Sequence, residues 1–342
     1  MNAIRFAAVA LTVVGCATAF AGDMKEKEGS CLRPIVKDGQ YGFINSDGNV
    51  VIQPQFDDAG QFHSGLAKVS VSGKWGFVNR DGDTAVNPKF DEVGDFHEER
   101  AKFSKGGKYG YINTEGNAVI TAQYADAKDF HDGFAAVKQD GQWGYIDKSG
   151  KWVASPQFGL AESFSDGLAR VRTGGMLDGK FGYIDKTGKF VINPKYNECG
   201  DFADGLAPVA MEEGWGYINK KGEVVVKGQF SHAYNFSDGL ARVRVGNMLG
   251  GQFGYINKEG KFVINARYDD SQDFHEGMAA VKVDGKWGYI NKEGNTVIQP
   301  SFNEAHAFHD GMACIRKGGT LGLGGKWGWV NKSGDVVWKP SS

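Results

Sequence analysis

Short apolar runs alternate with glycine-containing turns along most of the chain, and none of them has the spacing of an amphipathic helix. Residues 277–308 are representative. In them the β-rich runs Lys286–Asn291 and Asn295–Pro300 follow the turns Asp284-Gly285 and Lys292-Glu293-Gly294. Tight glycine turns between such runs are typical of β-hairpins. The pattern therefore predicts small antiparallel meanders of three strands each.

The meander repeats along the chain with a nearly constant period. An aromatic residue followed by glycine recurs with spacings of 34, 34, 34, 38, 34, 38, 34 and 40 residues. Such a period is typical of repeat arrays and propellers, in which each unit packs only on its neighbours. We interpret the aromatic residues as structural, and they are Tyr41, Trp75, Tyr109, Trp143, Phe181, Trp215, Phe253, Trp287 and Trp327.

Two glycines of each unit need a physical reason. The glycine of the second turn, such as Gly82, suits a left-handed backbone conformation that a β-carbon disfavours. The glycine of the middle strand, such as Gly76, would otherwise weaken that strand. We interpret Gly76 as a bare patch on which an aromatic ring of the adjacent unit lies flat. Both faces of every sheet would then be buried.

These motifs resemble a known family. The block Lys286-Trp-Gly-Tyr-Ile-Asn-Lys-Glu-Gly294, followed by Val-Ile-Gln-Pro300, is similar to the WG (or KWG) repeat of bacterial proteins, and the resemblance covers about residues 32–340. Tyr or Phe replaces Trp in four units and keeps a large ring. The resemblance implies an all-β repeat array of unknown function, without a catalytic set of residues to transfer.

Nine units can be arranged as a closed ring or as an open spiral. We expect a propeller-like toroid of nine three-stranded meanders, and the alternative is an open β superhelix or solenoid. Nine units exceed the usual four to eight blades, which favours the spiral. A disulfide between Cys31 in the first unit and Cys314 in the last would bring the two ends together and favours the ring.

The N-terminal segment predicts export. Residues 1–21 have the basic, apolar and small-residue regions of a signal peptide, with cleavage after Ala21. A polar leader, 22–30, and a single repeat domain, 31–342, follow. The expected location is periplasmic or secreted, with a lipoprotein anchored through Cys16 as the alternative. No segment has the length and hydropathy of a transmembrane helix.

Charge and motifs argue against several function classes. The chain has 39 Lys and Arg against 41 Asp and Glu, so no concentrated positive charge attracts nucleic acid. Five histidines, at positions 63, 97, 131, 275 and 309, share one repeat position that is Ser or Ala in other units. We interpret them as turn residues, with a row of imidazoles for metal or pH sensing as the alternative. No enzyme motif is intact, so we expect no catalysis, cofactor or metal.

The singular features are three longer, glycine-rich hairpins. Their tips carry apolar residues where a solvated turn is normally polar. Either the tips fold back onto neighbouring loops or they form a contact surface for a protein or cell-envelope partner. A glycan or small-ligand site is the alternative function, with Trp327 and Trp329 as the best exposed pair. The six candidate contact residues are Met176, Leu177, Met248, Leu249, Leu321 and Leu323.

Overall fold

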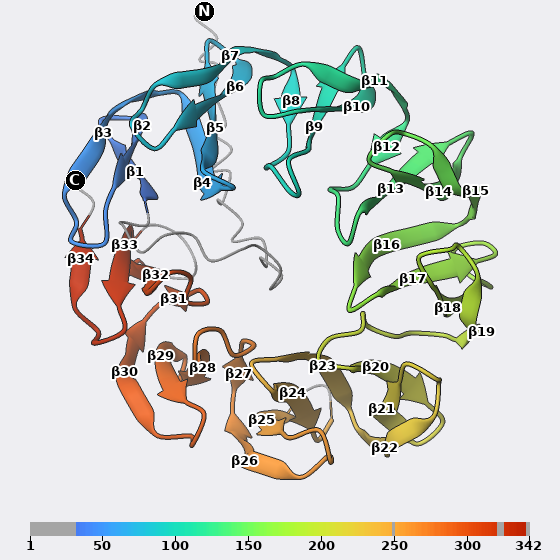
Figure 1. The fold of residues 1–342 in the computed structure, drawn as a ribbon. Coiled ribbons are helices and arrows are strands. Elements are labelled where there is room, and N and C mark those ends of the chain that lie inside the picture. Colours follow the sequence, from blue (N-terminus) through green and yellow to red (C-terminus); the bar gives the residue numbers. More distant parts are fainter. Residues whose placement is uncertain (1–31, 248–249, 320–324, 340–342) are drawn as a thin grey trace, which may run out of the picture.

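The protein is a closed ring of nine small β-sheets (Figure 1). The computed structural model describes residues 32–247, 250–319 and 325–339, and the regular structure of these residues is entirely β. No helix of the described residues could span a membrane. The sheets are arranged radially like the blades of a propeller, so the expected toroid is confirmed and the open superhelix is not the fold.

The blades follow one another in chain order (Figure 1). Within each blade the first strand lies nearest the centre of the ring and the last strand lies on the outside. Blades 1 to 3 contain β1 (Arg33–Lys37), β2 (Gln40–Ile44) and β3 (Val50–Phe56); β4 (Asp58–His63), β5 (Leu66–Val71), β6 (Lys74–Asn79) and β7 (Thr84–Phe90); β8 (Glu92–Val93), β9 (Ala101–Lys105), β10 (Lys108–Ile112) and β11 (Ala118–Tyr124). Blades 4 to 6 contain β12 (Asp126–Ala127), β13 (Phe134–Gln139), β14 (Gln142–Asp147) and β15 (Trp152–Phe158); β16 (Leu160–Ser165), β17 (Leu168–Thr173), β18 (Lys180–Ile184) and β19 (Phe190–Tyr196); β20 (Leu206–Met211), β21 (Gly214–Asn219) and β22 (Val224–Phe230). Blades 7 to 9 contain β23 (His232–Ser237), β24 (Leu240–Val245), β25 (Gln252–Ile256) and β26 (Phe262–Tyr268); β27 (Asp270–Ser271), β28 (Met278–Val283), β29 (Lys286–Asn291) and β30 (Thr296–Phe302); β31 (Glu304–Ala305), β32 (Met312–Lys317), β33 (Lys326–Asn331) and β34 (Val336–Trp338).

Most blades have one strand more than the sequence predicts. In the described residues only blades 1 and 6 have three strands, and the other seven have four. The extra strand is the segment that links two units, which pairs with the next blade as its innermost strand. Its pairing is broken by an irregularity, as between Ala161 and Phe164, or lasts only two residues, as in β8. This short or interrupted pairing leaves no alternating pattern in the sequence.

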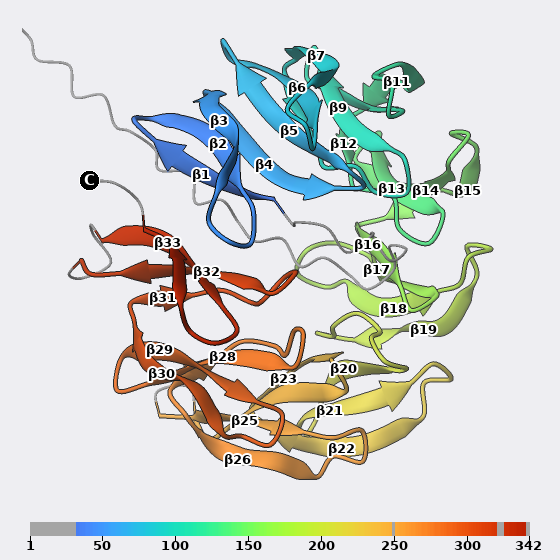
Figure 2. The ribbon, with the colours of Figure 1, turned by 60° about the vertical axis from the view of Figure 1, so that its left-hand side comes forward.

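Blade 1 meets blade 9 without exchanging strands (Figures 1 and 2). Every strand of blade 1 comes from the start of the described chain, and every strand of blade 9 comes from its last part. Ile35 and Ile44 of blade 1 share a buried cluster with Met312 and Trp329 of blade 9. The Trp329 indole donates to the Pro34 carbonyl at 3.3 Å. Cys31 lies outside the described residues, so the proposed Cys31–Cys314 disulfide stays a prediction.

Arg33 adds a charged contact at the same junction. Its side chain is 2 % exposed, and its guanidinium bonds to the His309 carbonyl and, at 2.8 Å, to the Asp310 carboxylate. The guanidinium carbon also lies 5.7 Å from the centre of the Trp329 ring. Within the described part of the chain, ring closure is therefore noncovalent: an apolar cluster with one buried guanidinium beside it.

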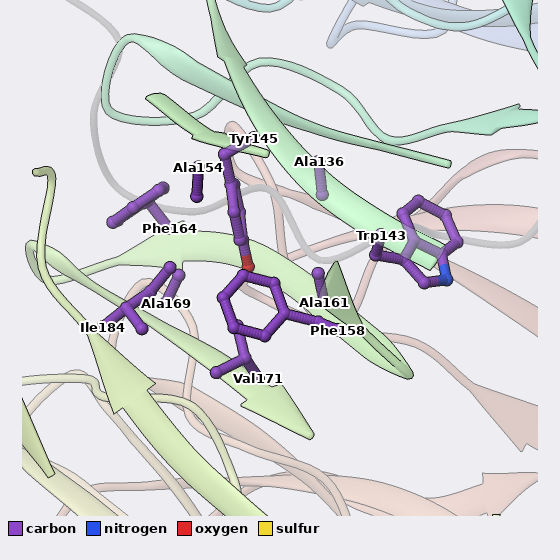
Figure 3. Packing of buried hydrophobic residues seen from close by; sticks show 10 residues of the cluster. All are labelled: Ala136, Trp143, Tyr145, Ala154, Phe158, Ala161, Phe164, Ala169, Val171 and Ile184. Atoms are coloured by element: carbon purple, nitrogen blue, oxygen red, sulfur yellow. The ribbon is translucent and has the colours of Figure 1, made fainter. Parts of the chain in front are cut away.

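Eight of the nine junctions between the described blades are held by a buried aromatic pair. The ring two positions after the repeat aromatic packs edge-on or tilted against a phenylalanine of the next blade, as Tyr145 does against Phe164 at 5.1 Å (Figure 3). The Tyr145 hydroxyl also donates to the Glu162 carbonyl at 2.6 Å. Centroid distances at these eight junctions are 4.6–5.1 Å, in the pairs Phe43–Phe62, Phe77–Phe96, Tyr111–Phe130, Tyr145–Phe164, Tyr183–Phe202, Tyr217–Phe236, Tyr255–Phe274 and Tyr289–Phe308.

The prediction for the glycine of the middle strand was wrong. A β-carbon on Gly76 would lie 2.6 Å from the Pro88 nitrogen, which belongs to the outer strand of the same blade. The register shifts here, because Trp75 pairs with Phe90 and Phe77 pairs with Val86. The outer strand bulges over the glycine, so the bare backbone accommodates a neighbour within the blade rather than a ring from the next one.

The prediction for the turn glycine is confirmed. Gly82 has φ of 89°, and the glycines at the same place in the other units have φ between 75° and 89°. Space adds a second reason, because a β-carbon on Gly82 would contact the Ile52 side chain of the preceding blade at 3.4 Å. The second turn of each unit thus helps to seal the junction.

Gly76→Ala should lower the free energy of unfolding by about 1–3 kcal/mol, because the new methyl group meets backbone atoms that cannot rotate away. Urea unfolding followed by circular dichroism measures the change. Trp75→Phe is the control and should cost less, since Phe181 and Phe253 occupy the same position in other units. An unchanged midpoint for Gly76→Ala would contradict the bulge explanation.

Candidate functional site

The ring has two faces that differ in chemistry. The innermost strands end at one face, and the turns that follow carry the five histidines; we call it the histidine face. The first hairpins, such as the one between β17 and β18 at 174–179, lie at the opposite ends of the strands; we call this the loop face. Strand direction therefore separates the histidines from the apolar tips.

The described apolar tip on the loop face is fully exposed. Met176 is 84 % exposed and Leu177 101 %. Two bonds hold the loop itself, from the Gly179 N–H to the Gly175 carbonyl at 3.1 Å and from the Gly175 N–H to the Asp178 carboxylate at 3.0 Å. The tip of blade 5 thus projects into solvent and does not fold back on a neighbour. Met248, Leu249, Leu321 and Leu323 lie outside the described residues.

The nine repeat aromatics are buried or half-buried in the structure. Trp143 and Phe253 are buried, and Tyr41, Trp75, Tyr109, Phe181, Trp215, Trp287 and Trp327 are half-buried. The pair suggested for glycan binding does not form an open platform. Trp329 is only 8 % exposed because it belongs to the closing cluster, and Trp327 packs beside His306 at 5.6 Å.

The histidines stack on one another across blades. His97 lies 5.5 Å from His63 and 5.0 Å from His131, and His275 lies 5.2 Å from His309, measured between ring centres. Burial, and then the charge of His97, lowers the pKa of His131. Burial, and then the charges of His275 and Arg33, lowers the pKa of His309. The protonated forms of His131 and His309 are therefore disfavoured in the folded ring.

The acidic residue next to the histidine connects successive blades, a role that the sequence did not reveal. The Asp132 carboxylate accepts the Gly167 N–H of the next blade at 3.1 Å, and Lys186 of that blade lies 3.5 Å from the same oxygen. Backbone bonds of 2.6–3.1 Å recur at Glu98–Gly133, Asp132–Gly167, Asp166–Gly205, Asp204–Gly239, Asp238–Gly277 and Glu276–Gly311. The signal in the sequence is the acid before glycine that six units carry, and the link between blades has no local signature.

The described residues offer little for catalysis. No group of three or more His, Cys, Asp or Glu side chains in 32–247, 250–319 and 325–339 is arranged to hold a metal ion. Burial raises the pKa of the Cys199 thiol to about 11, so this cysteine is protonated at neutral pH and is a poor nucleophile. The acids of the histidine face are occupied by backbone N–H groups and lysines.

Comparison with known families identifies the repeat. A family model described as a WG containing repeat matches residues 41–75, 75–109, 109–143, 143–176, 181–214, 215–248, 253–287 and 287–320. The chain belongs to the WG-repeat family. Each match runs from one repeat aromatic towards the next, so a WG repeat spans the middle and outer strands of one blade and the inner strands of the following one.

A solved structure of low sequence identity shares the propeller fold. The structure titled "Crystal structure of the eukaryotic initiation factor" is 10 % identical, with a TM-score of 0.66 over 91 % of this WG-repeat chain and 95 % of the other. "Dihydro-heme d1 dehydrogenase NirN in complex with DHE" is 11 % identical, with a TM-score of 0.48 over 81 % and 73 %. No curated protein matches the sequence. At these identities the likeness shows the fold alone.

Stability should fall as the pH drops below about 6.5, because the unfolded chain takes up protons on histidines that the folded ring keeps neutral. The pKa values of His131 and His309 are lowered by folding, so their contribution is intact above the unfolded value and declines until the folded value is reached. Urea titrations between pH 7.5 and 5 measure this decline.

The double variant His131→Ser and His309→Ser should show a shallower loss of stability between pH 7.5 and 5. Serine is a suitable replacement, because Ser165 and Ser237 occupy the same position in blades 5 and 7 and donate to the carbonyls of Phe202 and Phe274. A decline as steep as that of the unmodified protein would assign the pH dependence to other groups.

Proposed function

We propose that this WG-repeat protein is an exported, non-catalytic scaffold whose loop face binds a protein or cell-envelope partner. The observation that carries the proposal is the exposed pair Met176 and Leu177 at a tip held by its own backbone bonds. Adjacent apolar side chains that are exposed to solvent, unlike scattered single ones, are typical of contact sites. Methionine also adapts its shape to varied partners.

The architecture supports a binding role over a catalytic one. Nine buried clusters, one at each junction of the described blades, hold the ring together. A rigid ring presents its loops in fixed relative positions, which lowers the entropy cost of ordering them on a partner. The nearly balanced charge supports recognition by shape and apolar contact rather than by long-range attraction.

The double variant Met176→Ser and Leu177→Ser should abolish crosslinking of the protein to its partner in the producing cell while leaving thermal unfolding unchanged. Both side chains are exposed to solvent, so replacing them should not change the free energy of unfolding. Crosslinking with mass spectrometry measures the first outcome and circular dichroism the second. Val225→Ser is the matched control, because Val225 is 45 % exposed but lies on an outer strand.

Two outcomes would contradict this assignment of the loop face. Retained crosslinks in the double variant would move the contact surface elsewhere on the ring. A clear loss of thermal stability would show that Met176 and Leu177 serve the fold instead.

The export part of the proposal has its own test. Cleavage after Ala21 predicts a mature protein that begins at Gly22 and is found outside the cytoplasm. N-terminal sequencing of the purified protein checks this expectation. A blocked N-terminus at Cys16, with labelling by a fatty-acid analogue, would replace the soluble form by the lipid-anchored one, and an intact Met1 would overturn export.

A further inference from the structure

A pocket of about 400 Å³ opens in the arc of blades 5 to 7. Its walls include the rings of Phe181, Trp215 and Tyr234, and its polar lining includes Glu198, His232 and Asn235. Phe181 and Trp215 stand at the starts of β18 and β21, and His232 starts β23, so the pocket lies towards the loop face. Met176 and Leu177, the apolar tip residues that the structure describes, do not line it.

Two lining residues of the pocket, Gly200 and Pro208, depart from the pattern of most blades. Gly200 stands where five blades carry a long side chain, and its carbonyl accepts the Tyr183 hydroxyl at 2.7 Å. The equivalent acceptor residues in blades 4, 5, 7, 8 and 9 are Lys128, Glu162, Tyr234, Gln272 and His306. In blade 8 the Gln272 amide bonds to the Ala305 carbonyl at 2.8 Å and occupies this space.

Blades 2 and 3 also have glycine here, but a lysine covers it. A β-carbon on Gly60 would lie 2.7 Å from the Lys68 side chain, and one on Gly94 would lie 2.8 Å from Lys102. Blade 6 has Pro208 at that lysine position, as the pairing of Lys68 with Phe77 and of Pro208 with Tyr217 shows. In blade 6 the Pro208 ring and the Asn235 amide lie over the glycine instead, since a β-carbon on Gly200 would be 2.7 Å from Pro208 and 2.4 Å from the Asn235 oxygen. Gly200, Pro208 and Asn235 all line the pocket.

The wall of the pocket includes the Arg170 guanidinium, which already has partners in the protein. The Arg170 guanidinium donates to Asp201 at 2.9 Å and to the Cys199 carbonyl at 2.6 Å, and Glu162 lies 3.8 Å away. Arg170 therefore has little capacity left for an anionic ligand. Glu198 and Asp273, which also line the pocket, would repel one.

The ring of Tyr234 is not open to a cationic ligand. The Arg242 guanidinium carbon lies 3.6 Å from the centre of the Tyr234 ring and covers the face that a ligand cation would use. Burial lowers the pKa of His232, and Arg242 and Arg244 lower it further against the opposing effect of Glu198. The imidazole is therefore neutral at pH 7, with one donor and one acceptor nitrogen.

Three polar side chains of the pocket have unused hydrogen-bonding capacity. Within the part of the chain that the structure describes, no hydrogen bond is formed by the Glu198 carboxylate, the His232 ring or the Asn235 amide. Together they offer acceptors and donors in planar groups. They stand beside the indole of Trp215, whose centre lies 4.5 Å from that of His232.

We propose that the blade 6 pocket binds a neutral saccharide unit. A sugar ring combines an apolar C–H face, which packs on an aromatic ring, with hydroxyl groups that both donate and accept. Trp215 supplies the ring, Glu198 accepts from hydroxyls, and Asn235 and His232 both donate and accept. The inference does not rest on the proposed function, because the pocket shares no residue with the loop tips.

Titration of the mature protein with cellobiose, maltose and N,N′-diacetylchitobiose tests the proposal, with indole signals in NMR spectra and calorimetry as readouts. At least one of these neutral disaccharides should bind saturably with a millimolar or tighter dissociation constant. Digalacturonic acid, the charged comparison, should bind at least tenfold more weakly. Failure of all three neutral probes, or equal binding of the acid, would overturn the proposal.

The double variant Gly200→Gln and Pro208→Ala should fill the pocket. It copies the pair Gln272 and Ala280 that blade 8 carries at the same places. Binding of the disaccharide should weaken at least tenfold while thermal unfolding stays near that of the unmodified protein. Unchanged binding by a folded variant would contradict the site.

A second variant decides the matter if the filled pocket fails to fold. Glu198→Gln with Asn235→Ala removes groups that bind nothing within the described chain, so folding should be unaffected and binding should weaken about tenfold. Asp270→Asn is the matched control, because Asp270 is the equivalent of Glu198 in blade 8, beside the filled position. Equal effects of the two changes would contradict the assignment, as would no effect of the first.

Discussion

The buried aromatic pair at each junction is the interaction on which the ring depends. Tyr145 has no exposed surface, and its ring and its hydroxyl both use atoms of the next blade. A single three- or four-stranded sheet would therefore expose apolar side chains on both of its faces and would not be stable alone. Each blade therefore needs the next one as a packing partner, and this requirement continues around the ring until blade 9 meets blade 1. There Trp329 and Arg33 replace the usual pair, and the ring closes without strand exchange.

Much of this fold follows from the sequence, because a repeat places equivalent residues in equivalent environments. The period gave nine units, and the second-turn glycine has the left-handed conformation that its position requires. The same argument cannot say which neighbour occupies a given space. Gly76 faces the bulged outer strand of its own blade. Pro88 belongs to the repeat pattern, but its distance from Gly76 is not visible there. The inner strand was missed because its pairing is short or interrupted.

Of the two candidate functional features, one could be predicted from the sequence and the other could not. An apolar tip in a glycine-rich hairpin is recognisable from sequence, and Met176 and Leu177 are indeed exposed. The blade 6 pocket is not recognisable, because Gly200 and Pro208 lie eight residues apart and each is an ordinary residue in a β-rich repeat. Their effect depends on what fills that space elsewhere, namely Lys68, Lys102 or Gln272. The pocket is therefore recognised only when neighbouring blades are compared in space.

Departures from the repeat are concentrated in blades 5 to 7. This arc has Ser165, Ala203 and Ser237 where blades 2 to 4 and 8 to 9 stack histidines, and it contains the exposed tip and the pocket. A departure in a closed ring affects two junctions, so it is tolerated only where other contacts compensate. Here the Ser165 and Ser237 hydroxyls bond to carbonyls of the following blades, and acid-to-glycine bonds continue through the arc. The scaffold is thereby kept intact in the arc that carries the exposed tip of blade 5 and the pocket.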